Sequence, residues 1–199
     1  MKKISFVVPV FNEEENIHEF YRRLTQVMAP LPYDYEILFI DDGSKDRTSQ
    51  LIRELAGKDP HVQGYVFARN FGHQLALTCG LDQSTGDAVI SMDGDLQHPP
   101  EMVPELLKKW EEGFEIVQTV RKATEDATWF KNITSRLYYK LINSMSEVRI
   151  TPGGSDFRLM DRKAVDALNR FRERARFIRG MVNNLGFRYT TLEFVAPPR

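Results

Sequence analysis

Residues 88–95, with the sequence AVISMDGD, decide both the fold and the chemistry expected of this chain. The first five residues are mostly apolar and lack the alternation of a strand with one wet face, so they predict a strand covered on both sides. The acidic turn Asp93-Gly94-Asp95 follows at once. Because ligands bind beyond the carboxyl ends of strands in an open parallel sheet, this stretch predicts a buried strand that delivers two carboxylates to a ligand-binding edge.

Similar apolar runs recur along the chain, separated by segments with apolar side chains at helical spacing. Strands are expected at residues 4–10, 35–40, 62–68, 88–92, 116–120, 157–160 and 189–195, and helices of the second half at 129–145, 162–169 and 177–185. The alternation of strand and helix in the first half implies right-handed crossovers and a mainly parallel, Rossmann-like sheet flanked by helices. With no linker or repeat, the sequence predicts a single α/β domain over residues 1–199, with halves 1–122 and 123–199.

Composition excludes several classes of protein. A net charge of −1 carries no sign of nucleic-acid binding, and a single cysteine, Cys79, rules out an internal disulfide. No apolar run reaches the length of about 18 residues that a transmembrane helix needs. The glycine-rich loops of dinucleotide-dependent oxidoreductases and of P-loop enzymes are missing. The sequence ends on Pro197-Pro198-Arg199, just after a strand-like segment, and we expect a membrane-associated region to be absent from this chain.

Polar side chains follow four of the five strands expected in the first half. They are Glu13, Asp42, the pair Asp93 and Asp95, and Arg121. Each of them alone is an ordinary residue of a turn or of a helix start. Because the carboxyl ends of parallel strands meet at one edge of a sheet, their convergence favours a functional site.

The triplet Asp93-Gly94-Asp95 is the sharpest candidate for a metal site. Two carboxylates spaced by two residues in an extended segment point the same way, and Gly94 lets a phosphate or another backbone approach closely. Such a pair suits Mg²⁺ or Mn²⁺, which binds through one or two carboxylates plus substrate phosphates. Gln97 offers a third, neutral oxygen, whereas His98 precedes two prolines and is expected to pack or to form a turn.

Seven segments resemble family 2 glycosyltransferases in their order and spacing: VVPVFNEEENI, EILFIDDGSKDRT, RNFGHQLALTCGL, GDAVISMDGDLQHPPE, IVQTVR, SDFRLMDR and APPR. They cover nearly the whole chain. The resemblance is closest to the branch that moves a sugar onto a polyprenyl phosphate, such as dolichol-phosphate mannose synthases and bacterial undecaprenyl-phosphate glycosyltransferases. It implies a GT-A fold with a nucleotide-sugar and metal lobe at residues 1–122 and an acceptor lobe at residues 123–199.

The resemblance also implies roles for individual residues. The nucleotide-sugar would contact Pro9, Phe11, Glu13, Ile40, Asp42, Asp93, Gly94, Asp95, Arg121 and Arg199. The metal would be held by Asp93, Asp95 and Gln97, and the acceptor phosphate by Lys131, Ser135 and Arg136. Two positions depart from the family, which usually has tyrosine in place of Phe11 and more often alanine in place of Gly94.

The implied reaction moves a hexose, with inversion, from a nucleotide-diphosphate sugar to a polyprenyl phosphate such as undecaprenyl phosphate, and a UDP-sugar is favoured. The catalytic residues expected are Asp95, Arg121 and Asp156. A phosphate monoester with a second pKa of about 6 is already mostly anionic at neutral pH, so it needs cations to position it more than a base. Asp156 is the best candidate if a base is used, and otherwise it orients Arg158.

Other functions stay open. A family 2 transferase acting on a polysaccharide or other hydroxyl acceptor would share the donor half and would need a true base. A sugar nucleotidyltransferase is disfavoured because the loop after the first strand, NEEEN, is acidic. A sugar-nucleotide sensor without catalysis would bind the donor alone.

The resemblance further implies a place at the cytoplasmic side of the cell membrane, the inner membrane of a bacterium, with the catalytic domain in the cytosol. The aromatic segment 129–142 is interpreted as core or as a surface that meets the bilayer. The arginines at 172, 174, 176 and 179 are interpreted as a solvated face or as a help to membrane docking. The sugar, the nucleoside and the oligomeric state are left open by the sequence.

Overall fold

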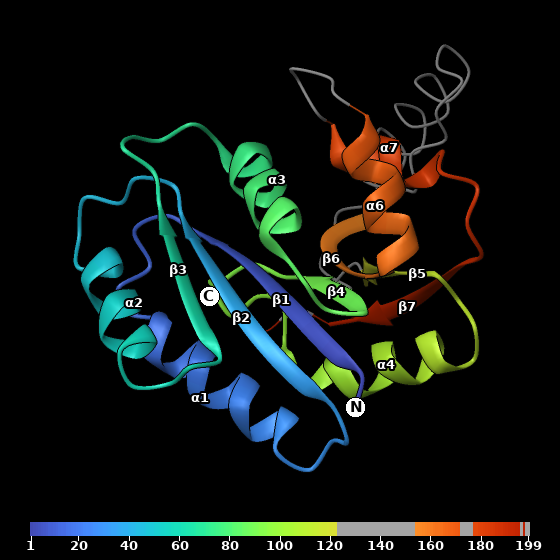
Figure 1. The fold of residues 1–199 in the computed structure, drawn as a ribbon, viewed down its shortest axis with the longest axis horizontal. Coiled ribbons are helices and arrows are strands. Elements are labelled where there is room, and N and C mark those ends of the chain that lie inside the picture. Colours follow the sequence, from blue (N-terminus) through green and yellow to red (C-terminus); the bar gives the residue numbers. More distant parts are fainter. Residues whose placement is uncertain (123–153, 172–176, 196, 198–199) are drawn as a thin grey trace, which may run out of the picture.

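A computed structural model of the protein describes residues 1–122, 154–171, 177–195 and 197, and its core is one seven-stranded sheet (Figure 1). The strands are β1 (Lys3–Val10), β2 (Asp34–Asp41), β3 (Val62–Val66), β4 (Ala88–Ser91), β5 (Ile116–Arg121), β6 (Gly154–Asp161) and β7 (Tyr189–Phe194). The helices are α1 (Ile17–Met28), α2 (Thr48–Ala56), α3 (His73–Gln83), the short 3₁₀ helix η1 (Pro100–Met102), α4 (Val103–Glu111), α6 (Arg162–Arg170) and α7 (Ile178–Asn183).

The order of the strands across the sheet is β3-β2-β1-β4-β6-β5-β7. β1 pairs in parallel with β2 and with β4, β2 pairs in parallel with β3, and β5 pairs in parallel with β7. The prediction of a mainly parallel sheet is therefore confirmed. The exception is β6, which lies between β4 and β5 and runs antiparallel to both.

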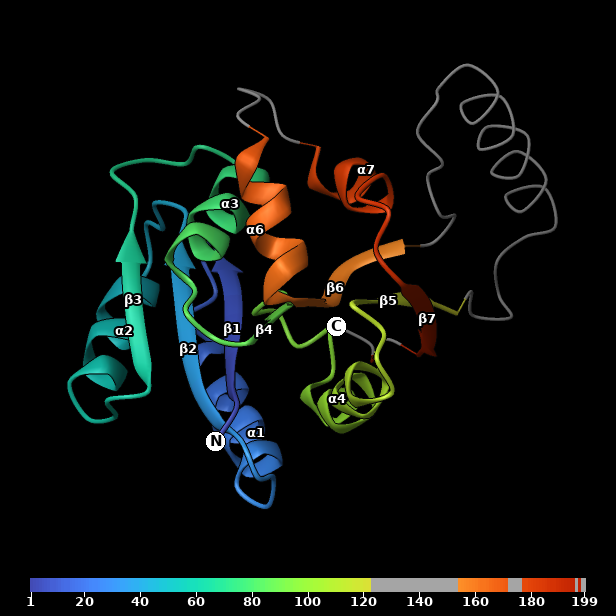
Figure 2. The same ribbon diagram turned by 45° about the vertical axis from the view of Figure 1, so that its right-hand side comes forward.

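Helices cover both faces of the sheet. Successive side chains of each strand point to opposite faces, and both faces carry apolar side chains that the helices bury. On one face α1, α2 and α4 bury residues such as Phe20, Ile52 and Leu106 against Phe6 and Phe39. On the other face α3, α6 and α7 bury their apolar sides (Figure 2). This second cluster includes Val7, Ile40, Leu77, Val165 and Ile178.

Local sequence explains where the helices lie. In α1 the buried residues Ile17, Phe20, Leu24 and Met28 recur every three or four residues, which gives the helix one apolar stripe. α6 begins directly after β6, where the side chain of Asp161 caps the helix by accepting a hydrogen bond from the Lys163 main-chain N–H. In the part of the chain that the structure describes, no helix combines the length and apolar character needed to cross a membrane. The helix expected at 129–145 lies outside that part.

Candidate active site

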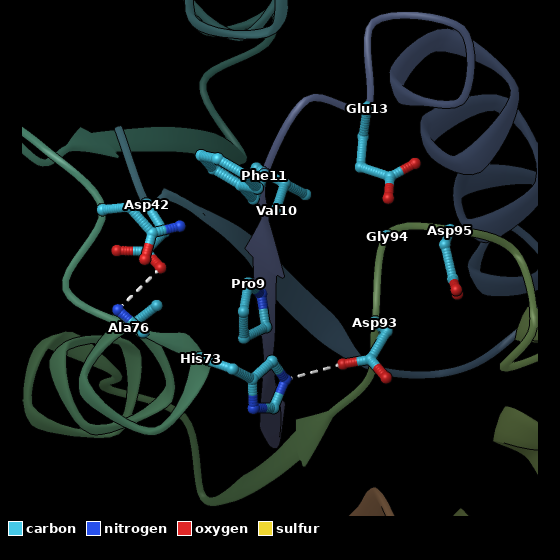
Figure 3. Close-up of a pocket in the computed structure, with 12 residues that line it drawn as sticks. Pro9, Val10, Phe11, Glu13, Asp42, His73, Ala76, Asp93, Gly94 and Asp95 are labelled. Atoms are coloured by element: carbon cyan, nitrogen blue, oxygen red, sulfur yellow. Dashed lines mark hydrogen bonds and ion pairs between the residues drawn. The ribbon is translucent and has the colours of Figure 1, made fainter. Parts of the chain in front are cut away.

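A cavity of about 290 Å³ opens at the carboxyl ends of β1, β2 and β4 (Figure 3). Its wall is formed by Pro9, Val10, Phe11, Glu13, Asp42, Asn70, Gly72, His73, Ala76, Asp93, Gly94 and Asp95. Seven of the residues expected to contact the nucleotide-sugar therefore lie around one hollow: Pro9, Phe11, Glu13, Asp42, Asp93, Gly94 and Asp95. They come from the end of β1 and from the loops after β1, β2 and β4, and each loop is held in place by its own hydrogen bonds.

The loop after β1 is tied to the loop after β2. The main-chain N–H of Asn12 donates to Ser44 Oγ at 2.9 Å, and the Asn12 side chain accepts from the N–H of Lys45 at 2.8 Å. Asn12 has φ of +55°, a left-handed conformation that asparagine tolerates better than most residues. Next to it, the N–H of Glu13 donates to Thr48 Oγ1 at 2.8 Å. These bonds fix Phe11, whose side chain is 41% exposed, at the rim of the cavity.

Asp42 holds the loop that leads into α3. Its two carboxylate oxygens accept hydrogen bonds from the main-chain N–H groups of Phe71, at 2.7 Å, and Gly72, at 2.9 Å. Gly72 has φ of +100°, which favours glycine at this position. Asp42 thus shapes the cavity from its wall, and any contact with a ribose would be added to this role.

The acidic triplet lies against the end of β1. A Cβ atom on Gly94 would lie only 2.5 Å from Val10 Cγ1, so glycine allows this close approach. Asp95 Oδ1 accepts from the main-chain N–H of Gln97 at 3.1 Å, which shapes the turn that follows. Leu96, inside this turn, has φ of +63°, a strained conformation for a bulky residue and one that often occurs near functional sites.

Asp93 is held by a histidine that the sequence interpretation missed. His73, the first residue of α3, lies 2.9 Å through Nε2 from Asp93 Oδ1 (Figure 3). Burial pushes the pKa of Asp93 up, but the hydrogen bond with His73, together with the charges of His98, His73 and Arg179, outweighs it, and the net shift is downward. The same hydrogen bond raises the pKa of His73 above 6.5. The carboxylate form of Asp93, which a metal would require, is therefore favoured.

His98 is buried, and packing and hydrogen bonds occupy its ring. Its Nδ1 accepts the main-chain N–H of Asp93 at 2.8 Å, so its proton lies on Nε2, which is 2.6 Å from Ser155 Oγ. The ring is stacked on Phe157 with centroids 5.2 Å apart, and burial lowers the pKa of His98. The expectation that this histidine has a packing role agrees with these contacts.

Gln97 and Arg121 lie together beside the triplet. Arg121 Nη1 is 3.4 Å from Gln97 Oε1, a long hydrogen bond at the exposed end of β5. Neither residue lines the cavity. For Gln97 to bind a metal, its side-chain oxygen would have to be shared with or released by Arg121.

Ile40 corrects one expectation. Its side chain is fully buried, lies in the core on the α3 side of the sheet and does not line the cavity, so it offers no surface to a base or ribose. The reason is the alternation along β2, which turns Ile40 under α3 while the next residues reach the edge. Four further expected residues, Lys131, Ser135, Arg136 and Arg199, lie outside the described residues.

Asp156 is separated from the cavity by His73. Its Oδ2 lies 3.9 Å from His73 Nδ1, and its two oxygens accept hydrogen bonds from Arg158 and Arg179. The expectation that Asp156 orients Arg158 agrees with this contact. The signal that could have revealed His73, Asn70 and Gly72 is their place at the start of a helix that follows a strand of a parallel sheet.

The residues present fit a divalent metal bound together with a substrate. No group of three or more His, Cys, Asp or Glu side chains able to hold a metal ion occurs among the described residues. Asp93 and Asp95, however, both line the cavity, and Mg²⁺ or Mn²⁺ often takes only one or two carboxylates and completes its shell with phosphates and water. The two carboxylates therefore suit a hard cation that takes its remaining ligands from a substrate and from water.

Comparison with known proteins identifies relatives along the whole chain. The family model described as glycosyl transferase family 2 matches residues 5–168. The chain is 46% identical over 195 residues to the uncharacterized glycosyltransferase YkcC of Bacillus subtilis, and this covers 98% of the chain and 60% of that protein. It is 43% identical over 197 residues to the bactoprenol glucosyl transferase of Shigella phage SfX, covering 99% of the chain and 65% of that protein. The chain thus spans less than two thirds of the length of these relatives.

Two solved structures share the fold at low sequence identity. The mannosyl-3-phosphoglycerate synthase from Rubrobacter xylanophilus has a TM-score of 0.71 at 16% identity, over 100% of this chain and 67% of that chain. The glucosyl-3-phosphoglycerate synthase from Mycobacterium tuberculosis, in complex with Mn²⁺, UDP-glucose and phosphoglyceric acid, has a TM-score of 0.62 at 20% identity, over 100% of this chain and 72% of that chain.

Proposed function

The chain belongs to glycosyl transferase family 2 and has the GT-A fold, and we propose that it moves a hexose from a UDP-sugar to a polyprenyl phosphate. The observation that carries the proposal is the gathering of Asp93, Asp95 and Phe11 around one cavity at the carboxyl ends of parallel strands. The bactoprenol glucosyl transferases among its relatives support a polyprenyl-phosphate acceptor.

The donor half of the site follows from the chemistry of the cavity wall. The exposed ring of Phe11 offers an aromatic face to the base, and Pro9 and Glu13 lie beside it. The diphosphate would lie toward Asp93 and Asp95, with Arg121 near its outer side. The complex of the M. tuberculosis relative with UDP-glucose supports a uridine nucleotide.

A bound Mg²⁺ or Mn²⁺ would offset the negative charge that develops on the leaving diphosphate. Asp93 and Asp95 would hold the ion, with Gln97 as an optional third oxygen. His73 helps to lower the pKa of Asp93 and holds its carboxylate through the 2.9 Å hydrogen bond. The Mn²⁺ in the complex of the M. tuberculosis protein supports a divalent metal in the reaction.

The acceptor phosphate would attack the anomeric carbon in line, with inversion. Because the phosphate is mostly ionised at neutral pH, the chain must position it and has no proton to remove. No general base is needed for such an acceptor. The contacts of Asp156 agree with this, because both of its carboxylate oxygens accept hydrogen bonds from arginines. Lys131, Ser135 and Arg136 remain the expected phosphate contacts in the segment before β6.

The acceptor is proposed to lie at a membrane surface, the cytoplasmic face of the bacterial inner membrane. Exposed aromatic and aliphatic side chains occur on α3 and beside α6 and α7, which lie on the same face of the sheet (Figures 1 and 2). They include Phe71, Leu75, Phe171 and Phe177, each at least 43% exposed. Apolar surface of this kind supports contact with the lipid that carries the acceptor.

The test is a transfer assay in detergent micelles with undecaprenyl phosphate and a panel of nucleotide-sugars, with and without Mn²⁺. Transfer from a UDP-sugar is expected only with the metal. Asp95→Asn is expected to lower turnover by about a hundredfold or more, in line with the loss of one group that stabilises developing charge. Retained turnover of this variant at saturating metal would contradict the metal site, and transfer to a hydroxyl acceptor alone would replace the proposed acceptor.

A further inference from the structure

Three charged side chains form a cluster on β6 and α7, next to the cavity. Asp156 Oδ1 accepts from Arg158 Nη2 at 2.6 Å, and Asp156 Oδ2 accepts from Arg179 Nη2 at 3.1 Å. Two guanidinium groups therefore share one carboxylate. The three side chains together carry a net charge of +1. Burying such a charge is costly, and Arg158 is fully buried.

The hydrogen-bonding capacity of the two arginines is only partly used. Arg158 is fully buried, yet its Nε and Nη1 have no partner within the described part of the chain, and the same holds for Arg179 Nε. Buried guanidinium nitrogens without acceptors are costly. Burial also lowers the pKa of Arg158, against the attraction of Asp156. The cluster is thus short of acceptor atoms as well as of negative charge.

The cluster lies beside the carboxylate proposed to hold the metal, with His73 between them. His73 links it to the metal-binding carboxylate, because Nε2 is 2.9 Å from Asp93 Oδ1 and Nδ1 is 3.9 Å from Asp156 Oδ2. Arg158 and Arg179 come from the second half of the chain, whereas the donor loops follow β1, β2 and β4 in the first half. The side chain of Arg179 is 36% exposed, so it can still meet a molecule from outside.

We propose that Arg179 binds the phosphate monoester of the acceptor, and that Asp156, itself fixed by Arg158, is a positioning residue for Arg179. The inference rests on the proposed function, because the acceptor is taken to be a phosphate. Arg179 supplies a charge-assisted contact to the phosphate, and the anion offsets the unbalanced charge of the cluster. Asp156 then serves as the anchor of an arginine and not as a general base.

The first experiment measures the KM for undecaprenyl phosphate at saturating UDP-sugar and Mn²⁺. Arg179→Ala is expected to raise this KM by about tenfold or more, the loss of a hydrogen bond between charged groups. Arg170→Ala is the matched control, because Arg170 is an exposed arginine at the end of the neighbouring α6. An equal rise in both variants would overturn a specific contact, and an unchanged KM in Arg179→Ala would overturn the proposal.

The second experiment separates an anchor from a base. Asp156→Asn is expected to raise the KM for the acceptor while kcat changes little, and the double variant with Arg179→Ala is expected to be no worse than Arg179→Ala alone. A large fall in kcat at unchanged KM would identify Asp156 as a base and overturn the assignment. The affinity for UDP, measured by calorimetry, reports that each variant is folded, and Arg179→Lys provides a milder change if Arg179→Ala is not.

A third measurement distinguishes the headgroup from the lipid. Inorganic phosphate is expected to compete with undecaprenyl phosphate in the parent protein and much less in Arg179→Ala, whereas uncharged undecaprenol should inhibit both equally. Loss of the undecaprenol effect in Arg179→Ala would place the contact on the lipid chain and overturn the proposal. A parent protein that binds UDP but transfers to no polyprenyl phosphate would contradict the proposed function itself, while transfer with an unchanged KM in Arg179→Ala contradicts only this inference.

Discussion

At the scale of single residues, Glu36 shows how the chain keeps a charge inside the sheet. It lies on β2 with only 2% of its surface exposed and accepts hydrogen bonds from Ser5 Oγ at 2.6 Å, the Thr85 N–H at 2.8 Å and Lys3 Nζ at 2.7 Å. Burial pushes the pKa of Glu36 up, but these hydrogen bonds outweigh it and lower the pKa below 4.5. The ionised form is therefore the native one.

This gives a pH dependence with a definite sign. Because the folded pKa of Glu36 lies below the unfolded value, its stabilisation is present above about pH 4.5 and is lost as the pH falls through the folded pKa. Urea titrations between pH 3 and pH 7 should show a free energy of unfolding that falls below pH 4.5. Glu36→Gln should flatten that part of the curve and lower stability at pH 7. An unchanged slope in Glu36→Gln would show that other carboxylates carry the effect.

Phe11 gives a second prediction at this scale. Its ring is 41% exposed at the rim of the cavity, where it is free to stack on a base. Phe11→Ala is expected to weaken UDP binding by about 1–3 kcal/mol, the usual value of one base–aromatic stack. Phe11→Tyr should bind UDP as tightly as the parent, because it keeps the aromatic face. Calorimetric titration with UDP checks both, and equal affinity of all three proteins would exclude stacking on this ring.

The sequence predicted the place of the residues that follow a strand directly, such as Glu13, Asp42, Asp93 and Asp95, at one edge of the sheet. A strand end has a fixed place in a parallel sheet, so sequence position translates into spatial position. Ile40 was wrong because a shift of one residue along β2 turns a side chain from the edge into the core. His73 was missed although it stands at the start of a helix that follows a strand, because its contact with Asp93 joins this helix start to the loop after β4 and the sequence does not report the distance between the two.

At the scale of elements, the approach of the acidic turn to β1 depends on one missing methyl group. A Cβ atom on Gly94 would lie 2.5 Å from Val10 Cγ1, which is too close for real atoms. Gly94→Ala is therefore expected to lower the free energy of unfolding by about 1–3 kcal/mol, the usual cost of overpacking.

The effect of Gly94→Ala is expected to depend on the side chain at position 10. In a Val10→Ala background the same change at Gly94 should cost much less, because the colliding methyl group is gone. Gly57→Ala is the matched control, since a Cβ there would have its nearest neighbour at an ordinary 3.5 Å. Chemical denaturation of the four proteins of the cycle checks the coupling. Additive effects of Gly94→Ala and Val10→Ala would show that the turn moves as a whole.

Strand direction was the part of the element scale that the sequence left undetermined. The apolar run in β6 predicted a strand, and its pairing with both β4 and β5 in antiparallel orientation could not be read from it. Burial on both faces gives a strand the same composition whichever way it runs. The parallel direction of β1, β2, β3 and β4 could be predicted, because a helix stands between each of these strands and the next one along the chain.

At the scale of the whole molecule, a ligand that binds only the folded state must raise its stability. At a hundred times its dissociation constant, UDP with Mn²⁺ should add about 2.7 kcal/mol. For a domain of this size that corresponds to a rise in Tm of roughly 5–10 °C. Thermal melts with UDP and either Mn²⁺ or EDTA check the metal requirement, with Asp95→Asn as the control. An equal rise in EDTA would contradict a metal shared with the diphosphate.

The position of β6 in the sheet has a consequence for folding during synthesis. β4 leaves the ribosome long before β6. Until β6 has emerged up to Asp161, the edge of β4 that β6 will cover offers unpaired main-chain groups to any neighbouring strand. β5 has no neighbour toward the centre of the sheet during the same interval. A nascent chain stalled after β4 and before β6 would thus be prone to aggregate through the unpaired edge of β4. Chaperones that bind this edge would be needed until β6 is inserted.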